Sequence, residues 1–192
     1  MKKRFFVIFS IGLIFIALCG SCKKAAAPQQ QPVKAEQTAE KQNSVVPNCP
    51  EPERLVNDFA GILGDVQQLE DSLVAIAVAT SNQICVVTMN DLGGFEPGQM
   101  ATEIGKKWGV GDAKRNNGVI ILIKPKAAAG KGEAFIAVGT GLESVISNDA
   151  CTQIVNEQMI PCFKENDYAG GVWAAVRAVR DLAVTKFNEP AK

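Results

Sequence analysis

The fold is decided by the stretch from Trp108 to Glu143, which reads WGVGDAKRNNGVIILIKPKAAAGKGEAFIAVGTGLE. Its centre, Val119–Ile123, is continuously apolar and rich in β-branched residues, with Asn-Gly before it and proline after it. This pattern predicts a strand that is buried on both faces. A second apolar run, Phe135–Val138, pairs most simply with it as an antiparallel hairpin. The glycine-rich turns Gly109–Asn117 and Gly139–Glu143 are then expected to share one sheet edge.

The segments around the hairpin predict a small mixed sheet between two layers of helices. Residues 83–89 have the composition of a strand, and apolar residues at a spacing of four mark a helix over 100–108. Together with the buried strand they form a βαβ crossover, in which the two strands are parallel. Further helices are predicted over 66–80, 147–160 and 168–187 from their apolar periodicity. The expected fold is therefore a three-layer α/β/α sandwich.

The first 21 residues have the features of a lipoprotein signal peptide: a basic start, an apolar core and small residues before Cys22. We expect Cys22 to receive lipid and become the mature N-terminus, although Cys19 stands where leucine is usual. An ordinary cleaved signal and a retained anchor are the alternatives. Residues 22–52 are rich in Ala, Gln, Pro, Lys and Glu, which predicts a disordered tether. The folded domain is expected over 53–188.

Composition and charge exclude several classes of protein. The chain has 192 residues, of which 47% are hydrophobic and 21% are charged, enough for one domain. Removal of the first 21 residues leaves 17 basic and 20 acidic residues, which gives no basic face for a nucleic acid. Gly139-Thr-Gly141 has Ser144 where a third glycine belongs, so no nucleotide cofactor is expected. A functional site at the edge shared by the two glycine turns is therefore expected to bind neither a nucleic acid nor a nucleotide.

The chemistry of the chain is limited by the absence of histidine. His-activated nucleophiles and His-ligated metals are excluded, so carboxylates, amides and backbone remain. Asp112, Asn116, Asn117 and Glu143 bring oxygen atoms to the edge shared by the two glycine turns, and hard cations prefer such ligands. Asp58 lies between apolar residues and needs a partner if it is buried.

Structural interpretations of the same residues remain open. Glu143 is expected near a helix start, where a negative charge is favourable, and Asn-Gly supplies a left-handed turn. Asp91 follows the first strand of the βαβ unit at its carboxyl end and is a competing site residue. An aspartate in a surface loop is the simpler interpretation of Asp91.

Six cysteines are present, and no CxxC repeat joins them. Cys22 is the expected lipid site, Cys49 lies in the tether and Cys85 lies in an apolar strand. Cys151 and Cys162 would be roughly 16 Å apart on one helix, which is too far for a disulfide, although Pro161 could break that helix. Buried, unpaired thiols are therefore expected.

Several motifs in order resemble the TPM domain family. They are Val56-Asn-Asp58 with Gly61 and Leu63, Trp108-Gly-Val-Gly, Asn116-Asn-Gly-Val119, and Val138-Gly-Thr-Gly-Leu-Glu143 followed by Asp149. The resemblance covers about residues 55–186. It implies an α/β/α sandwich that is exported or membrane-tethered. It also implies either calcium binding with weak phosphatase activity or a role in the maintenance of membrane complexes.

The residues and the resemblance together give two functional hypotheses. The first is a lipid-anchored module of the bacterial cell envelope that binds another membrane protein without catalysis, on the periplasmic or the outer surface. The second is a slow phosphatase that acts on phosphate monoesters with a divalent metal. For the second, we predict that Asp58, Asp112 and Glu143, with Asn116 or Asn117, hold Ca²⁺ or Mg²⁺.

Overall fold

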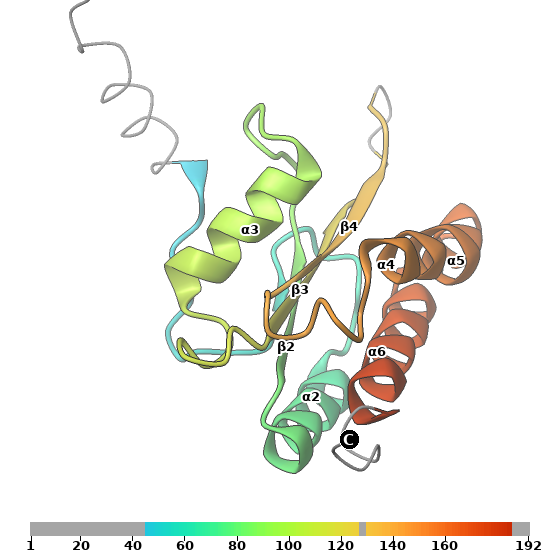
Figure 1. Ribbon diagram of the computed structural model, residues 1–192. Helices are drawn as coiled ribbons and strands as arrows, with labels where there is room; N and C mark the ends of the chain where they lie inside the picture. Colours follow the sequence, from blue (N-terminus) through green and yellow to red (C-terminus); the bar gives the residue numbers. More distant parts are fainter. Residues whose placement is uncertain (1–44, 127–129, 186–192) are drawn as a thin grey trace, which may run out of the picture.

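A four-stranded sheet forms the centre of the computed structural model, which describes residues 45–126 and 130–185 (Figure 1). The signal peptide and most of the expected tether lie outside these residues. In chain order the elements are β1 (Val56–Asp58), α2 (Gln67–Thr80), β2 (Gln83–Thr88), α3 (Pro97–Trp108), β3 (Gly118–Lys124), β4 (Glu133–Val138), α4 (Asn148–Ile154), the π-helical turn η1 (Val155–Met159), α5 (Ile160–Lys164) and α6 (Tyr168–Thr185).

The strand order is β1-β2-β3-β4, so neighbours in the sequence are neighbours in the sheet. β1, β2 and β3 run parallel, with Val56 beside Val86 and Val86 beside Ile121. β4 runs antiparallel to β3 and places Ile136 beside Ile121. Both the predicted hairpin and the predicted parallel βαβ unit are confirmed, and Ile121 lies at the centre of the sheet with no exposed surface.

Helices cover both faces of the sheet, which makes the expected three layers (Figure 1). Side chains alternate along a strand, so β3 contributes to two cores. Ile120 and Leu122 pack with Met100 and Ile104 of α3 on one face. The other core is larger and lies under α2 and the C-terminal helices; its β3 members are Val119, Ile121 and Ile123. In the described part of the chain a single helix therefore covers one face, and four helical segments and a π turn cover the other.

The end of α3 is set by Gly109, which has φ 65° and lies in the left-handed region that glycine adopts at low cost. Its N–H bonds back to the last turn of the helix, where the carbonyl groups lack partners. The first glycine-rich turn therefore begins where the sequence placed it.

The helix predicted over 147–160 continues past its expected end. Pro161 lacks an N–H and cannot join a regular α-helical ladder. The π-helical turn η1 lies before this proline, and Ile160 N donates to Val155 O at its end. The helix α5 then begins at Ile160. Cys151 and Cys162 are free and lie on opposite sides of this turn. No helix of the described residues is long and apolar enough to span a bilayer.

Packing begins upstream of residue 53, where the composition placed the start of the domain. Val46 is 4% exposed and belongs to the core under α3. Lys107 Nζ donates to Val46 O at 2.7 Å, and Trp108 Nε1 donates to Pro47 O at 2.9 Å. Residues 45–47 therefore cross the end of α3 as part of the domain.

Candidate functional site

The two glycine-rich turns lie against each other at the start of β3. Gly139 N donates to Gly118 O at 2.8 Å, and Gly141 N donates to Asn116 O at 3.0 Å. A Cβ atom at Gly141 would overlap the carbonyl oxygen of Arg115, so only glycine permits this approach. The expected juxtaposition of the turns is confirmed, and it is made by backbone contacts.

Asp112 shapes the first of these turns. Its Oδ1 accepts hydrogen bonds from the N–H groups of Lys114 and Arg115, both at 2.9 Å. This Asx-type turn leads to Asn116, whose φ of 49° is left-handed. One carboxylate oxygen of Asp112 therefore serves the local backbone, and Oδ2 accepts no hydrogen bond from a described residue.

Asn117, the fifth residue predicted as a ligand, is the buried anchor of the turn. It is 4% exposed, and its Oδ1 accepts from Asp112 N at 2.8 Å. Its Nδ2 donates to Ser81 O and to Asn82 Oδ1. The side chain thereby joins the end of α2 to the turn before β3, and its oxygen already accepts a hydrogen bond from the chain.

A pocket of about 530 Å³ opens between α3 and the two turns, and we call it the glycine-turn pocket. Its floor includes Ile120 and Ala137, which lie on the α3 face of the sheet. Its polar lining comes from three segments: Thr102 and Lys106 of α3, Asp112 and Asn116 of the first turn, and Thr140 and Glu143 of the second. Three of the five predicted ligands therefore share one pocket.

Glu143 is the least constrained of these groups. It is exposed, and within the described ranges no hydrogen bond or ion pair joins it to another residue. It does not open a helix as the sequence suggested, because α4 begins only at Asn148 and turns occupy the intervening residues. Stabilisation of a helix end therefore does not explain Glu143.

Asp58 lies at the other end of the sheet, which corrects its predicted place beside Asp112 and Glu143. It ends β1 and pairs with Thr88, the last residue of β2, whereas Asp112 precedes β3. Parallel strands put their carboxyl ends at the edge opposite to the start of β3. Five residues of strand separate the two edges, which is roughly 16 Å at about 3.3 Å per residue.

The carboxylate of Asp58 is occupied by the chain itself. Oδ1 accepts from Ile62 N at 3.1 Å and from Thr88 Oγ1, and Oδ2 accepts from Leu63 N at 2.8 Å. Thr88 is fully buried, and its Oγ1 in turn accepts from Ala60 N. The partner that the sequence required for Asp58 is this loop, which its carboxylate closes.

Asp91 also belongs to the Asp58 end, beyond β2. It is exposed, and its Oδ1 accepts from Gly93 N at 3.0 Å, which fits the interpretation as a surface-loop aspartate. Within the described residues no three His, Cys, Asp or Glu side chains are grouped as metal ligands.

The oxygen donors of the glycine-turn pocket are of the kind that binds a hydrated divalent cation. Glu143 and Oδ2 of Asp112 are two carboxylate donors, and Asn116 adds an amide oxygen. Mg²⁺ commonly keeps several waters and binds through one or two carboxylates, so this donor set is chemically suitable. Thr102 and Thr140 add two hydroxyl oxygens to the lining of the same pocket.

Sequence reasoning missed Thr102, Lys106 and Thr140. Thr102 and Lys106 are four residues apart on α3 and therefore share a helix face. A helical wheel of the helix that ends before Gly109 would have shown both residues on one face. Thr140 lies in the Gly-Thr-Gly segment, whose glycines predict a turn and give no indication of a role for the hydroxyl group between them. Lys106 also lines the pocket, and its ammonium group is paired with Glu103 Oε1 at 2.9 Å.

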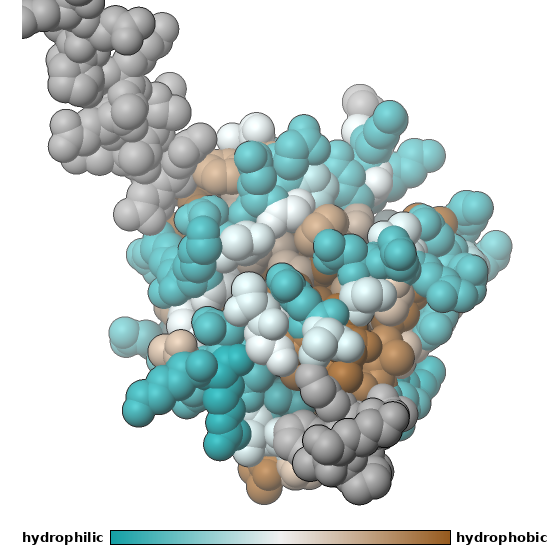
Figure 2. All heavy atoms as spheres, viewed as in Figure 1, coloured by the Kyte–Doolittle hydropathy of each residue, from teal (hydrophilic) through white to brown (hydrophobic). Residues whose placement is uncertain are grey.

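An apolar surface adjoins the second turn. Leu142, Val145 and Ala183 line a pocket with Asn82 and Arg115, and Figure 2 shows hydrophobic side chains gathered beside α6. Asn82 is 3% exposed, and its Nδ2 has no hydrogen-bond partner among the described residues. The face that carries the glycine turns thus combines a polar pocket with an apolar area.

The fold and the order of its motifs agree with the comparison to known families. The TPM domain family matches residues 56–182, which include all four strands and most of α6. This chain belongs to the TPM domain family. The TPM domain accordingly includes both ends of the sheet, with Asp58 as well as Asp112 and Glu143. No curated protein sequence matches the chain.

Solved structures share the architecture of this TPM domain. The N-terminal domain of a P. gingivalis protein, solved by NMR in solution, is 26% identical, with a TM-score of 0.63 over 78% of this chain and 96% of that one. The N-terminal domain of a Corynebacterium glutamicum protein is 15% identical, with a TM-score of 0.53 over 74% of this chain and 88% of that one. The second likeness concerns the fold alone.

Proposed function

We propose that this TPM domain is the binding module of a lipid-anchored cell-envelope protein and that it works without catalysis. The separation of Asp58 from Asp112 and Glu143 carries this proposal. It removes the three-carboxylate site on which a metal-assisted reaction was predicted. What is left at the glycine turns is an open pocket with carboxylate and hydroxyl groups beside an apolar surface, which suits recognition of another protein.

The anchor in this proposal is supported by the basic, apolar and small-residue order that ends at Cys22. Cys22→Ser is expected to block lipid attachment and to leave the precursor unprocessed. Labelling of cells with radioactive palmitate measures this. Undiminished labelling of the variant would contradict the assignment.

The partner in this proposal is another membrane protein of the envelope. An affinity pull-down of the full chain from detergent-solubilised envelope tests it with a pair of variants. Thr140→Arg places a long charged side chain at the mouth of the glycine-turn pocket, and Gln153→Arg makes the same change at an exposed position of α4. A protein retained by the wild type and by Gln153→Arg is expected to be lost with Thr140→Arg. Equal retention by both variants would contradict binding through this pocket.

Metal-assisted hydrolysis of phosphate monoesters is the second candidate. The shared lining of one pocket by Asp112, Asn116 and Glu143 favours it. A cation that binds only the folded form stabilises it by about 2.7 kcal/mol at one hundred times its dissociation constant. Thermal unfolding is therefore measured with EDTA and with millimolar Ca²⁺ or Mg²⁺.

The same metal test separates the two candidates. No shift with either ion would end the phosphatase hypothesis. A shift that disappears in Glu143→Gln, together with a hydrolysis reaction lost in the same variant, would reverse our preference. Asp91→Asn is the matched control, since Asp91 is an exposed aspartate at the other end of the sheet.

A further inference from the structure

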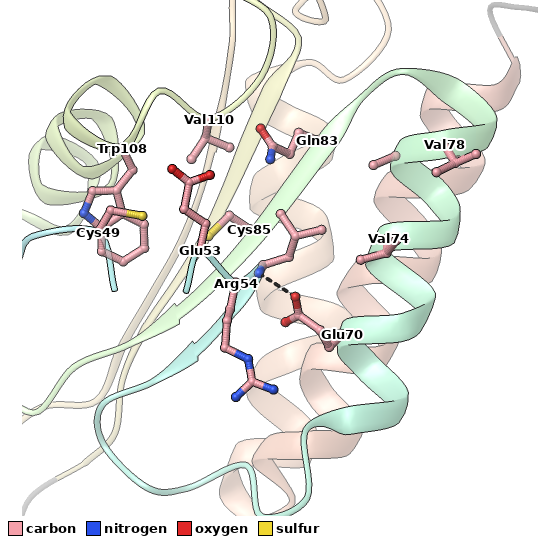
Figure 3. A pocket seen from close by; sticks show the side chains of 12 residues that line it. Cys49, Glu53, Arg54, Glu70, Val74, Val78, Gln83, Cys85, Trp108 and Val110 are labelled. Carbon is pink, nitrogen blue, oxygen red and sulfur yellow. Dashed lines mark hydrogen bonds between the residues drawn. The ribbon is translucent and has the colours of Figure 1, made fainter. Parts of the chain in front are cut away.

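Two cysteines from distant parts of the sequence open into one pocket at the β1 edge of the sheet. Cys49 and Cys85 both line this pocket, whose volume is about 420 Å³, together with Glu53 and Trp108 (Figure 3). Both thiols are free, and Cys85 is buried while Cys49 is partly exposed. We call this the two-thiol pocket.

Contacts upstream of Cys49 fix its position. Val46 is buried in the same core as Cys85, on the α3 face of the sheet. The bonds from Lys107 and Trp108 to Val46 O and Pro47 O hold the chain at the end of α3. Cys49 follows two residues later, and Figure 3 shows its side chain beside the indole ring of Trp108. The thiol is therefore presented at the pocket by an anchored segment.

The edge of the sheet is open where Cys85 lies. Among the described residues β1 pairs only with residues 86–88 of β2, so residues 83–85 have no strand partner on that side. Asn57 Nδ2 donates to Cys85 Sγ at 3.6 Å, which is the only hydrogen bond of this sulfur among the described residues. Cys85 pairs with Ile120 of β3 on the other side, and its buried side chain belongs to the same core as Val46.

We propose that Cys49 and Cys85 form a reversible disulfide that fastens the segment 45–49 to β2. This bond is independent of the proposed binding function and gives the two-thiol pocket a role of its own. It replaces the expectation of unpaired thiols for these two residues only. Cys151 and Cys162 lie on the C-terminal helices and do not line this pocket.

The order of the chemical steps follows from the surroundings of each sulfur. Burial raises the pKa of Cys85 to about 12, the amide of Asn57 lowers it, and negative charge at Cys49 raises it. Burial also raises the pKa of Cys49, and Glu53 adds to that shift. The thiolate is the attacking species and must reach the oxidant, so the more accessible Cys49 attacks first.

The oxidant is a small disulfide such as glutathione disulfide, or an exposed disulfide of a thiol oxidoreductase. Cys49 Sγ loses its proton, bonds to one sulfur of that disulfide and releases the other as a thiol. Cys85 Sγ then loses its proton, bonds to Cys49 Sγ and releases the second thiol. Two electrons and two protons pass to the oxidant, which ends as two thiols.

Peptide mapping of the full chain tests the bond directly. The protein is purified with reductant, transferred into excess glutathione disulfide, alkylated and digested without reduction. We expect one cross-linked pair of peptides, joined through Cys49 and Cys85 and lighter than the two reduced peptides by two hydrogen atoms. Dithiothreitol should restore both as alkylated thiols. Cys162→Ser should keep the link, and Cys49→Ser should leave Cys85 as a free thiol.

Three results would overturn the proposal. In the first, Cys49 ends as a mixed disulfide with glutathione while Cys85 is still a free thiol. In the second, both residues stay reduced under conditions in which Cys162 is modified. In the third, Cys49 or Cys85 is found linked to a different cysteine. The wild-type protein decides among these results, so misfolding of a variant does not affect the test.

Discussion

At one end of the sheet Asp58 accepts three hydrogen bonds from its own loop and from Thr88, whereas at the other end Glu143 has no partner among the described residues. Both are carboxylates in motifs of the TPM domain family. The first closes a loop over buried strand ends, and the second lines an open pocket. A carboxylate beside a core must be satisfied by the fold, and an exposed one is available to a ligand.

The largest effect on stability is expected from a substitution in β3, the strand on which both ends of the sheet depend. Ile121 is fully buried between β2 and β4, and both ends depend on β3. Ile121→Ala should lower the free energy of unfolding by about 2 to 5 kcal/mol through lost burial and the cavity left behind. Urea unfolding measures this. An unchanged midpoint would mean that the strand is not central.

Removal of the Asp58 carboxylate should affect folding directly. Asp58→Ala leaves the N–H groups of Ile62 and Leu63 without their acceptor. It also removes the acceptor of the Thr88 hydroxyl group. The expected loss is about 1 to 3 kcal/mol. Asp91→Ala is the matched control at the same end, with an expected change within about 0.5 kcal/mol. Equal losses of unfolding free energy in the two variants would contradict the idea that Asp58 stabilises its loop more than Asp91 does.

The thiol of Cys85, in the strand between the two ends, allows burial to be tested through the pH dependence of stability. Cys85 has its pKa raised from 9.0 to about 12, mainly by burial. Between these values the unfolded chain loses the thiol proton and the folded chain keeps it, so stability falls as pH rises. The slope should be about 1.4 kcal/mol per pH unit. Urea titrations in reductant should show a shallower decline in Cys85→Val than in the wild type, and identical slopes would contradict the burial of this thiol.

The smallest effect is expected at Glu143. Glu143→Gln removes a charge that no described residue pairs with, so in EDTA the free energy of unfolding should change by less than about 0.5 kcal/mol. The same urea experiment measures it beside Asp58→Ala. A loss as large as that of Asp58→Ala would show that Glu143 also supports the fold, and the contrast between the two ends would fail.

The sequence by itself determined the elements that depend on local pattern. The apolar run of β3, the short connection to β4 and the periodicity of the helices predicted the hairpin, the parallel βαβ unit and the three layers. The contact of the two glycine turns followed as well, because an antiparallel partner must return to the start of β3. Asp112, Asn116 and Glu143 were therefore brought to one pocket in prediction and in structure.

Only the tertiary structure decided the place of Asp58 and the role of Asn117. β1 has three residues, too few for a periodic pattern, and only its parallel pairing with β2 sends Asp58 to the opposite end. Asn117 became a buried anchor through bonds to residues about 35 positions away. Packing of residues 45–47 on α3 likewise depends on partners about 61 positions away. Local pattern carries no information on such distant partners, because each is set by how complete elements pack.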